Sequence, residues 1–225
     1  DGAPLLGICN GAQILVEAGL VGPAAPVAGA AGAALAHNRI PRRDGYYTRW
    51  VFLAPGPAAR ACLFTRDLTE PVPMPMAHGE GRFLVAPAEQ EKEFGRHIAL
   101  AYADAAGAPA RGFPENPNGS LLGAAGVTND RGNVLALMPH PERAQLLAQV
   151  PEDLPGPWGK ARRGAHESPS ATMVRSDQQP ASGSPRASVA PREPSPGRAA
   201  DLESPGPGLA LFAALARHLG GKGGR

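Results

Sequence analysis

The fold is decided by residues 4–20, which read PLLGICNGAQILVEAGL. An apolar run at residues 4–8 leads into a Cys-Asn-Gly turn, and the apolar residues after it recur at the spacing of a short buried helix that Gly19 closes. A strand, a tight turn and a helix in this order predict a nucleophile elbow, in which small flanking residues let the backbone turn sharply. The residue held out at the turn would be Cys9.

Two interpretations of Cys9 are open at this point. At a helix N-terminus, unpaired N–H groups and the helix dipole would favour the thiolate, and the same N–H groups could face the oxyanion of a tetrahedral intermediate. Alternatively, Cys9 is a buried structural cysteine, because a free cysteine packs like a small apolar residue. The pattern Gly-x-Cys-x-Gly is too short to decide between a nucleophile and a core residue.

A histidine and a glutamate follow the last predicted strand. Residues 121–128 and 133–138 flank the turn sequence NDRG and predict a hairpin, whose second strand leads to Pro-His-Pro-Glu. In an extended backbone, residues two apart point to the same side, so Glu142 could orient the imidazole of His140 and leave its other ring nitrogen to take a thiol proton. An isolated His-Pro-Glu is more commonly a solvated loop. Combined with Cys9, it predicts a Cys–His–Glu triad.

Composition and charge narrow the class of protein. The 225 residues include 22 basic and 20 acidic ones, and a net charge of +2 gives no reason to expect nucleic-acid or membrane binding. The two cysteines, Cys9 and Cys62, are too few for a disulfide framework and lack the spacing of zinc sites. We therefore expect a cytoplasmic protein without a bound metal. No apolar run reaches the roughly 18 residues of a membrane span, and no phosphate-binding Gly-x-x-x-x-Gly-Lys-Ser/Thr motif occurs.

The chain divides into three parts by composition. Residues 1–150 predict an α/β core with a mixed sheet. Residues 151–207 are rich in Pro, Ser, Gly and Arg and poor in large apolar side chains, so we expect a disordered insertion. Residues 208–225 predict an amphipathic helix that docks on the core, and then a frayed tail. Because the chain starts at Asp1 and enters a strand almost at once, we expect the core to lack its N-terminal part. Further strands of the core are predicted at residues 47–53, 83–85 and 97–102.

Five motifs carry a resemblance to a known family. GICNGAQ at residues 7–13 and MPHPER at residues 138–143 together resemble class I glutamine amidotransferases. The glutaminase subunits of phosphoribosylformylglycinamidine synthase, an enzyme of purine synthesis, are similar in three more blocks: RWV at 49–51, AHGEGRF at 77–83 and NPNGS at 116–120. The resemblance implies a flavodoxin-like three-layer sandwich, here without the strands and the Gly-Gly loop that precede the elbow in the family.

The resemblance also implies a reaction. Members hydrolyse glutamine and pass the ammonia to a synthetase subunit, which uses ATP and Mg²⁺ to convert formylglycinamide ribonucleotide to its amidine, in some cases with a small bridging subunit. The resemblance implies that Cys9 is the nucleophile, His140 the general base and acid, and Glu142 the orienting carboxylate. It implies no cofactor in this chain.

Substrate-binding residues are expected next to the triad. Gly11, Gln13 and His78 are the candidates for the glutamine pocket. A helix-capping role for Gln13, and a solvated loop for His78 and Glu80, are the alternatives. The block NPNGS is first of all a turn sequence, and its functional interpretation depends on the resemblance.

Three other functions stay open. The chain could be the glutaminase of a different synthetase, such as one that makes guanylate or carbamoyl phosphate. It could be a non-catalytic fragment that keeps the fold, or a cysteine peptidase on a related fold. The two blocks AHGEGRF and NPNGS argue against the first, the residues of the triad argue against the second, and His-Pro-Glu argues against the third.

Overall fold

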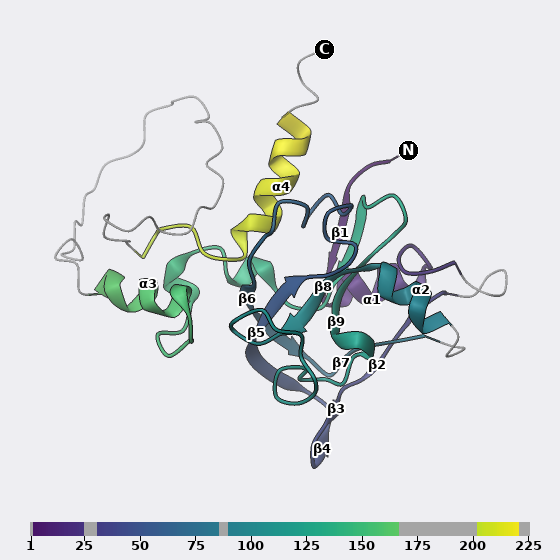
Figure 1. Cartoon of the computed structure of the whole chain (residues 1–225), viewed down its shortest axis with the longest axis horizontal. Helices are drawn as coiled ribbons and strands as arrows, with labels where there is room; N and C mark the ends of the chain where they lie inside the picture. The colour runs from purple at the N-terminus through teal and green to yellow at the C-terminus, as the bar shows by residue number, and fades with distance from the viewer. Residues whose placement is uncertain (1, 25–30, 86–89, 167–201, 221–225) are drawn as a thin grey trace.

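The computed structural model describes residues 2–24, 31–85, 90–166 and 202–220. These residues form a six-stranded sheet in the order β1-β10-β9-β8-β5-β6, in which β1 runs parallel to β10 and the other neighbours are antiparallel (Figure 1). The mixed α/β sheet expected from the sequence is thereby confirmed. Its strands are β1 (Leu5–Ile8), β5 (Tyr47–Pro55), β6 (Val72–His78), β8 (Ile98–Ala103), β9 (Ala124–Thr128) and β10 (Val134–Leu137).

Apolar side chains cover both faces of this sheet, because successive residues of a strand point to opposite sides. In β10, Leu135 and Leu137 join one core cluster, while Val134 and Ala136 join the other. Helix α4 (Leu209–Gly220) packs against the first cluster through Leu211. Helices α1 (Asn10–Glu17) and α2 (Glu91–Arg96) pack against the second, which gives the predicted three layers.

Shorter elements surround the sheet. The hairpin predicted on both sides of NDRG is formed by β9 and β10, and the predicted C-terminal helix is α4. Helix α3 lies at the end of the molecule away from α1 and α2 (Figure 1). These elements are β2 (Ala34–His37) paired with β7 (Glu80–Leu84), β3 (Arg39–Ile40) paired with β4 (Arg43–Asp44), α3 (Pro157–His166), and the 3₁₀ turns η2 (Leu121–Gly123), η3 (Pro141–Arg143) and η4 (Leu147–Gln149).

Strand β6 was missed by the sequence prediction, which placed no strand between residues 53 and 83. The sequence VPMPMAH carries two prolines, Pro73 and Pro75, which argue against a central strand. Among the described strands, β6 is at the end of the strand order and pairs with β5 alone, so a missing N–H on its outer edge costs no ladder bond. The edge position therefore reconciles the prolines with a strand.

The disordered insertion predicted for residues 151–207 is wrong for its first part. Residues 157–166 form α3, and Leu154 and Ala165 are buried with Leu147 and Val150 in a small core cluster. The few apolar residues of this segment are concentrated in its first part, where they pack against Trp50 and Phe52. The prediction used the average composition of all 57 positions, and this average hides a short apolar stretch. Residues 167–201 and 221–225, including most of the predicted insertion and the predicted tail, lie outside the described residues.

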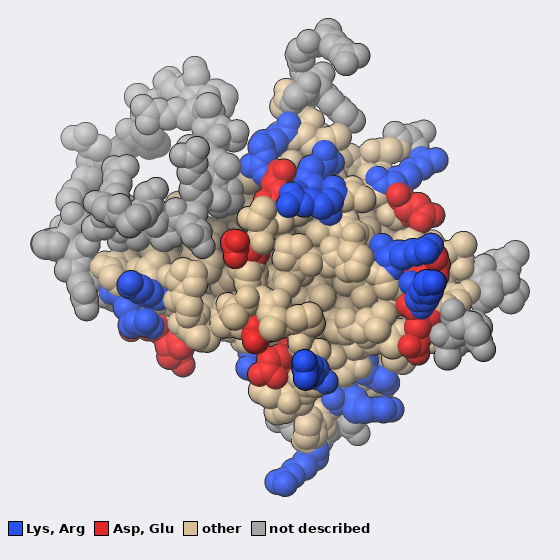
Figure 2. Space-filling model, in the orientation of Figure 1, with Lys and Arg blue, Asp and Glu red and all other residues tan. Residues whose placement is uncertain are grey.

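Among the residues that the structure describes, no helix has the length and apolarity that crossing a membrane would take. On the face shown in Figure 2, basic and acidic side chains are mixed along the edge rather than gathered into one patch of a single sign. This distribution agrees with the balanced net charge of +2.

Candidate active site

Cys9 occupies a strained turn between β1 and α1. Its backbone angles are φ 51° and ψ −105°, and its N–H donates to the carbonyl of Leu137 at 2.9 Å. A residue other than glycine in such a conformation costs on the order of 1–3 kcal/mol, and strain of this kind clusters at functional sites. A Cβ at Gly7 would lie 2.5 Å from the carbonyl oxygen of Gly11, so the close approach of strand and helix requires a glycine there. The predicted elbow is therefore present.

The thiol of Cys9 faces strand β6. Its Sγ lies 3.9 Å from the carbonyl oxygen of Ala77. Burial raises the pKa of the Cys9 thiol above its ordinary value, and this outweighs the backbone N–H of Asn10 and the charge of Arg143, which both lower it. The sequence argument for a favoured thiolate is therefore wrong in its net direction. The thiol needs a base to remove its proton at neutral pH.

His140 and Glu142 supply a base and its partner. The Nδ1 of His140 lies 2.5 Å from Oε1 of Glu142, and the imidazole is almost fully buried. The carboxylate can only accept, so Nδ1 carries the hydrogen when Glu142 is ionised, and Nε2 presents its lone pair. Among the described residues, Nε2 has no hydrogen-bond partner. The contact was predicted on an extended backbone, but it forms where the chain enters the 3₁₀ turn η3.

Strand β6 brings the cysteine and the histidine together. The N–H of His140 donates to the carbonyl of Pro75 at 2.8 Å, two residues before the carbonyl that Cys9 faces. The charges of Glu142 and Arg143 both act on the Cys9 thiol. The structure thus gathers the three predicted triad residues around one strand, although they are 131 positions apart in the sequence, counted from Cys9 to His140.

His78, the last residue of β6, is buried next to this cluster. Its Nδ1 lies 3.0 Å from Oδ1 of Asn38, whose Nδ2 donates to the carbonyls of His78 and Gly45. Because Asn38 Nδ2 is committed as the donor, Oδ1 must accept, and Nδ1 of His78 carries the hydrogen. Burial, assisted by the nearby His140, lowers the pKa of His78 to about 4, so its ring is neutral at physiological pH.

The orientation of His78 leaves one atom free for a ligand. Its Nε2 is a buried acceptor with no partner among the described residues. A Cβ at Gly81 would lie 2.2 Å from Cε1 of His78, so the ring fits only because residue 81 is a glycine. With 3% of its surface exposed, His78 does not sit in a solvated loop.

The block NPNGS supports strand β7, whose Gly81 lies against the ring of His78. Asn118 is fully buried and its Nδ2 donates to the carbonyl of Gly81 at 2.7 Å, while Ser120 Oγ accepts from the N–H of Phe83. Asn38 and Asn118 therefore fix this part of the site. Sequence reasoning gave Asn38 no role, because a single asparagine between short strands carries no local signal.

Gln13 and Gly11 lie on α1 beside the elbow. Gln13 donates through Nε2 to the carbonyl of Glu80 at 2.9 Å, so its amide bridges α1 and β7 rather than capping the helix. It also lines a cavity of about 270 Å³ together with Asn10 and Glu80. The position of a Cβ at Gly11 meets no atom within 4 Å, so the backbone there borders open space. Gly11 and His78 do not line this particular cavity.

The carboxylate of Glu80 pairs with a histidine of β2. Its Oε1 lies 3.1 Å from Nε2 of His37, and both side chains are largely exposed. Within the described part of the chain, no group of three or more His, Cys, Asp or Glu side chains could hold a metal ion.

A cysteine on a strained strand-to-helix turn of an α/β sheet, beside a histidine bonded to a carboxylate, is the arrangement that cysteine-dependent hydrolysis requires. Comparison with known proteins is more specific. Residues 2–175 match the family model of the CobB/CobQ-like glutamine amidotransferase domain, and the chain therefore belongs to this family. The resemblance seen in the sequence motifs is confirmed.

Curated relatives within this class share one name. The chain is 40% identical over 144 residues to phosphoribosylformylglycinamidine synthase subunit PurQ of Pyrococcus horikoshii, covering 64% of this chain and 56% of the relative. It is 42% identical over 145 residues to the same subunit of Thermomicrobium roseum, covering 64% and 55%. The chain thus spans little more than half the length of these relatives. A structure of PurLQS from Thermotoga maritima aligns at 32% identity with a TM-score of 0.45, covering 64% of this chain and 53% of that one.

Proposed function

We propose that this chain is the glutaminase component of phosphoribosylformylglycinamidine synthase. It would hydrolyse glutamine to glutamate and ammonia, and the ammonia would serve the ATP-dependent conversion of formylglycinamide ribonucleotide to its amidine. The observation that carries the proposal is Cys9 on its strained elbow, facing the strand that also holds His140. The similarity to PurQ subunits supports this synthase over others, and the family favours an amidotransferase over a cysteine peptidase.

The reaction would begin with attack of Cys9 on the carboxamide carbon of glutamine. The thiol proton passes to Nε2 of His140, while Glu142 holds Nδ1–H and stabilises the resulting imidazolium. Because the raised pKa keeps the Cys9 thiol protonated in the free enzyme, the proton would leave only when His140 and the substrate are both in place. The new C–S bond turns the carboxamide oxygen into an oxyanion.

The first turn of α1 would stabilise this oxyanion. The first hydrogen bond of the helix runs from the N–H of Gln13 to the carbonyl of Cys9, at 3.1 Å. The N–H groups of Asn10 and Gly11 come before it, so they have no acceptor within the helix and can donate to the oxyanion. His140 then protonates the nitrogen, and ammonia leaves as the C–N bond breaks. Water attacks the thioester with His140 again as base, which releases glutamate and restores the thiol.

We assign His78 to recognition of the side-chain amide. A neutral imidazole with a fixed lone pair on Nε2 attracts the N–H of a carboxamide and disfavours the carboxylate of glutamate. This difference would favour the substrate over the product. Gly11 and Gln13 complete the proposed glutamine site, Gly11 by leaving room and Gln13 by joining α1 to β7.

The remaining parts of the reaction would lie with other chains. The synthetase subunit would hold ATP and Mg²⁺ and take up the ammonia, with a bridging subunit where the complex contains one. We place the complex in the cytoplasm, where the Cys9 thiol stays reduced. In this chain, residues 1–150 and α4 would form the catalytic unit, since Leu211 of α4 is buried in the core of the sheet.

A comparison of two cysteine variants tests the proposal. Glutamate formed from glutamine would be measured for the wild-type chain, Cys9→Ala and Cys62→Ala, each mixed with the synthetase subunit of a relative. Cys62 is the matched control, because it is a free cysteine buried in the core. We expect Cys9→Ala alone to abolish glutamate formation, while synthesis from added ammonia continues. Equal activity of wild type and Cys9→Ala would contradict the proposal.

A further inference from the structure

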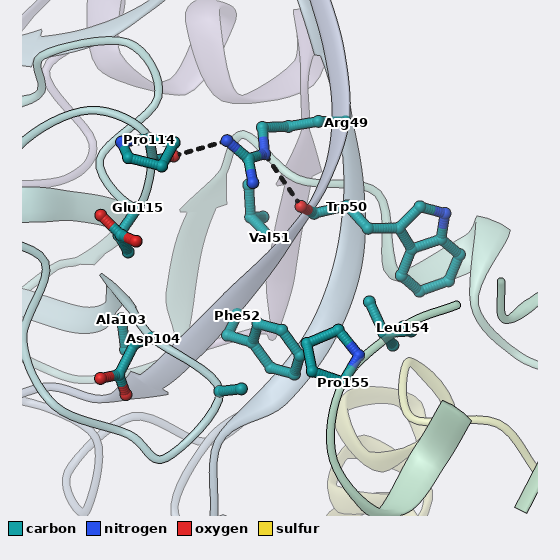
Figure 3. A pocket seen from close by; sticks show the side chains of 11 residues that line it. Arg49, Trp50, Val51, Phe52, Ala103, Asp104, Pro114, Glu115, Leu154 and Pro155 are labelled. Carbon is teal, nitrogen blue, oxygen red and sulfur yellow. Dashed lines mark hydrogen bonds between the residues drawn. The ribbon is translucent and has the colours of Figure 1, made fainter. Parts of the chain in front are cut away.

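A second cavity lies outside the candidate active site. Its volume is about 320 Å³, and it opens where β5 runs past the end of β8, which pairs with β5 only from Phe52 onward. Its walls come from residues 49–52 of β5, from the turn at Asp104, from the loop at Pro114 and Glu115, and from residues 154–155 before α3 (Figure 3). Ligand cavities range from about 300 to 1,000 Å³, so this one suits a small molecule.

Arg49 places a fixed positive charge at the cavity. Its Nε donates to the carbonyl of Trp50 at 3.2 Å and its Nη1 donates to the carbonyl of Pro114 at 2.8 Å. These two bonds hold the guanidinium plane, and Nη2 has no protein acceptor among the described residues. Within the same residues no carboxylate forms an ion pair with Arg49. The guanidinium therefore keeps donor capacity for an anionic group.

Two carboxylates lie on the opposite side of the cavity from Leu154 and Pro155 (Figure 3). Asp104 is held by its Oδ1, which accepts from the N–H groups of Ala106 and Ala108, both at 2.9 Å. Its second oxygen and the carboxylate of Glu115 have no ion-pair partner in the described part of the chain. With Arg49, the three charges sum to −1, so electrostatics favours a cationic group on the acidic side.

The remaining wall is apolar. Phe52, Leu154 and Pro155 border the cavity, and Phe52 packs against the small core cluster that contains Leu154. A ligand that satisfied all three parts would carry a cation, an anion and an apolar group on a small frame. A free α-amino acid has these three features and the right size.

We propose that this cavity binds a free α-amino acid with an apolar side chain. The ammonium lies between Asp104 and Glu115, the carboxylate accepts from Arg49, and the side chain contacts Phe52 and Pro155. The proposal is independent of the glutaminase reaction, because no residue of this cavity belongs to the proposed triad or glutamine site.

Titration with L-leucine, followed by calorimetry and by ligand-observed NMR, tests the proposal on the whole chain. L-Leucinamide lacks the carboxylate, N-acetyl-L-leucine lacks the ammonium, and glycine lacks the side chain. We expect saturable binding of leucine, and binding at least about tenfold weaker for each analogue. Loss of a charge-assisted hydrogen bond is enough for a factor of about ten in leucinamide and N-acetyl-leucine, and loss of apolar burial is enough in glycine. Equal binding of leucine and N-acetyl-leucine, or no saturable binding of leucine, would overturn the proposal.

Variants locate the site. Asp104→Asn keeps an oxygen that can accept from Ala106 and Ala108, and Glu115→Gln changes an exposed side chain, so both should fold. We expect each to weaken leucine binding about tenfold, with Asp130→Asn, a change at an exposed acid elsewhere, as the unchanged control. Leucine binding should also survive alkylation of Cys9. Loss of binding on alkylation would place leucine in the glutamine site and overturn the assignment.

Discussion

The close contact between β1 and α1 at the elbow can be tested by replacing Gly7 with alanine and measuring stability. The new Cβ would lie 2.5 Å from the carbonyl oxygen of Gly11 and 2.6 Å from Cδ1 of Leu15, where ordinary contacts begin at 3.4 Å. Leu15 can change rotamer, but the carbonyl belongs to the backbone of α1. The helix must therefore move by about 0.9 Å, the difference between 2.5 and 3.4 Å, for the methyl group to fit.

The cost of this movement can be bounded. Overpacking of a well-packed region costs typically about 1–3 kcal/mol, and a backbone clash places Gly7→Ala near 3 kcal/mol. Gly11→Ala is the matched control, because its Cβ meets no atom within 4 Å. In the first turn of α1, alanine should even stabilise the fold by up to about 1 kcal/mol.

Urea denaturation followed by circular dichroism measures both free energies of unfolding. We expect Gly7→Ala to be about 3 kcal/mol less stable than wild type, and Gly11→Ala to be at least as stable as wild type. Because Gly11 borders the proposed glutamine site, its alanine variant should lose glutaminase activity while it keeps its stability. A Gly7→Ala variant within about 0.5 kcal/mol of wild type would refute the close packing of β1 on α1.

Three further predictions concern the triad and its neighbour. Glu142→Gln should lower kcat by on the order of 10²–10⁴ with little change in KM, because an amide can orient His140 without stabilising its cation; glutamate release measures this. His78→Asn should reduce the loss of stability on acidification from pH 6.5 to 4, measured by urea denaturation at each pH. In that window the histidine binds a proton in the unfolded chain, whereas folded His78 does not, because its pKa is lowered to about 4. This difference lowers the free energy of unfolding of the wild type by about 3 kcal/mol. The alkylation rate of Cys9 should still rise with pH above 9.0, since burial raises its pKa.

Each of these has a contradicting outcome. A Glu142→Gln enzyme with unchanged kcat would remove the carboxylate from the mechanism. If wild type and His78→Asn lost the same stability between pH 6.5 and 4, the pKa of His78 would not be lowered in the folded state. A Cys9 alkylation rate that levels off below pH 9.0 would show a lowered thiol pKa, in disagreement with the burial described above.

The elbow could be predicted because its signal is local. Gly7 and Gly11 are spaced two residues on each side of Cys9, and the same spacing produces the close strand-to-helix contact in the structure. The pairing of His140 with Glu142 was also local, although the backbone that achieves it is a 3₁₀ turn rather than an extended strand. Most of the candidate triad could therefore be predicted from patterns within a few residues of each other.

The features that the sequence did not predict depend on tertiary structure. The sign of the Cys9 pKa shift depends on how deeply the thiol is buried, and the helix N-terminus alone suggested the opposite direction. Strand β6 is compatible with its prolines only at the edge of the sheet. The contact of Asn38 with His78 spans 40 positions, and α3 is stabilised by packing near Trp50, so neither leaves a signal in the local sequence.

The most direct test of the account is covalent labelling of the chain with a diazo-ketone analogue of glutamine, followed by intact mass and peptide mapping. We predict a single adduct on Cys9, suppressed by excess glutamine and absent from Cys9→Ala, while the buried Cys62 stays unmodified. Labelling of Cys62, or no adduct on a chain that circular dichroism shows to be folded, would contradict the claim that Cys9 is the nucleophile of a formed glutamine site.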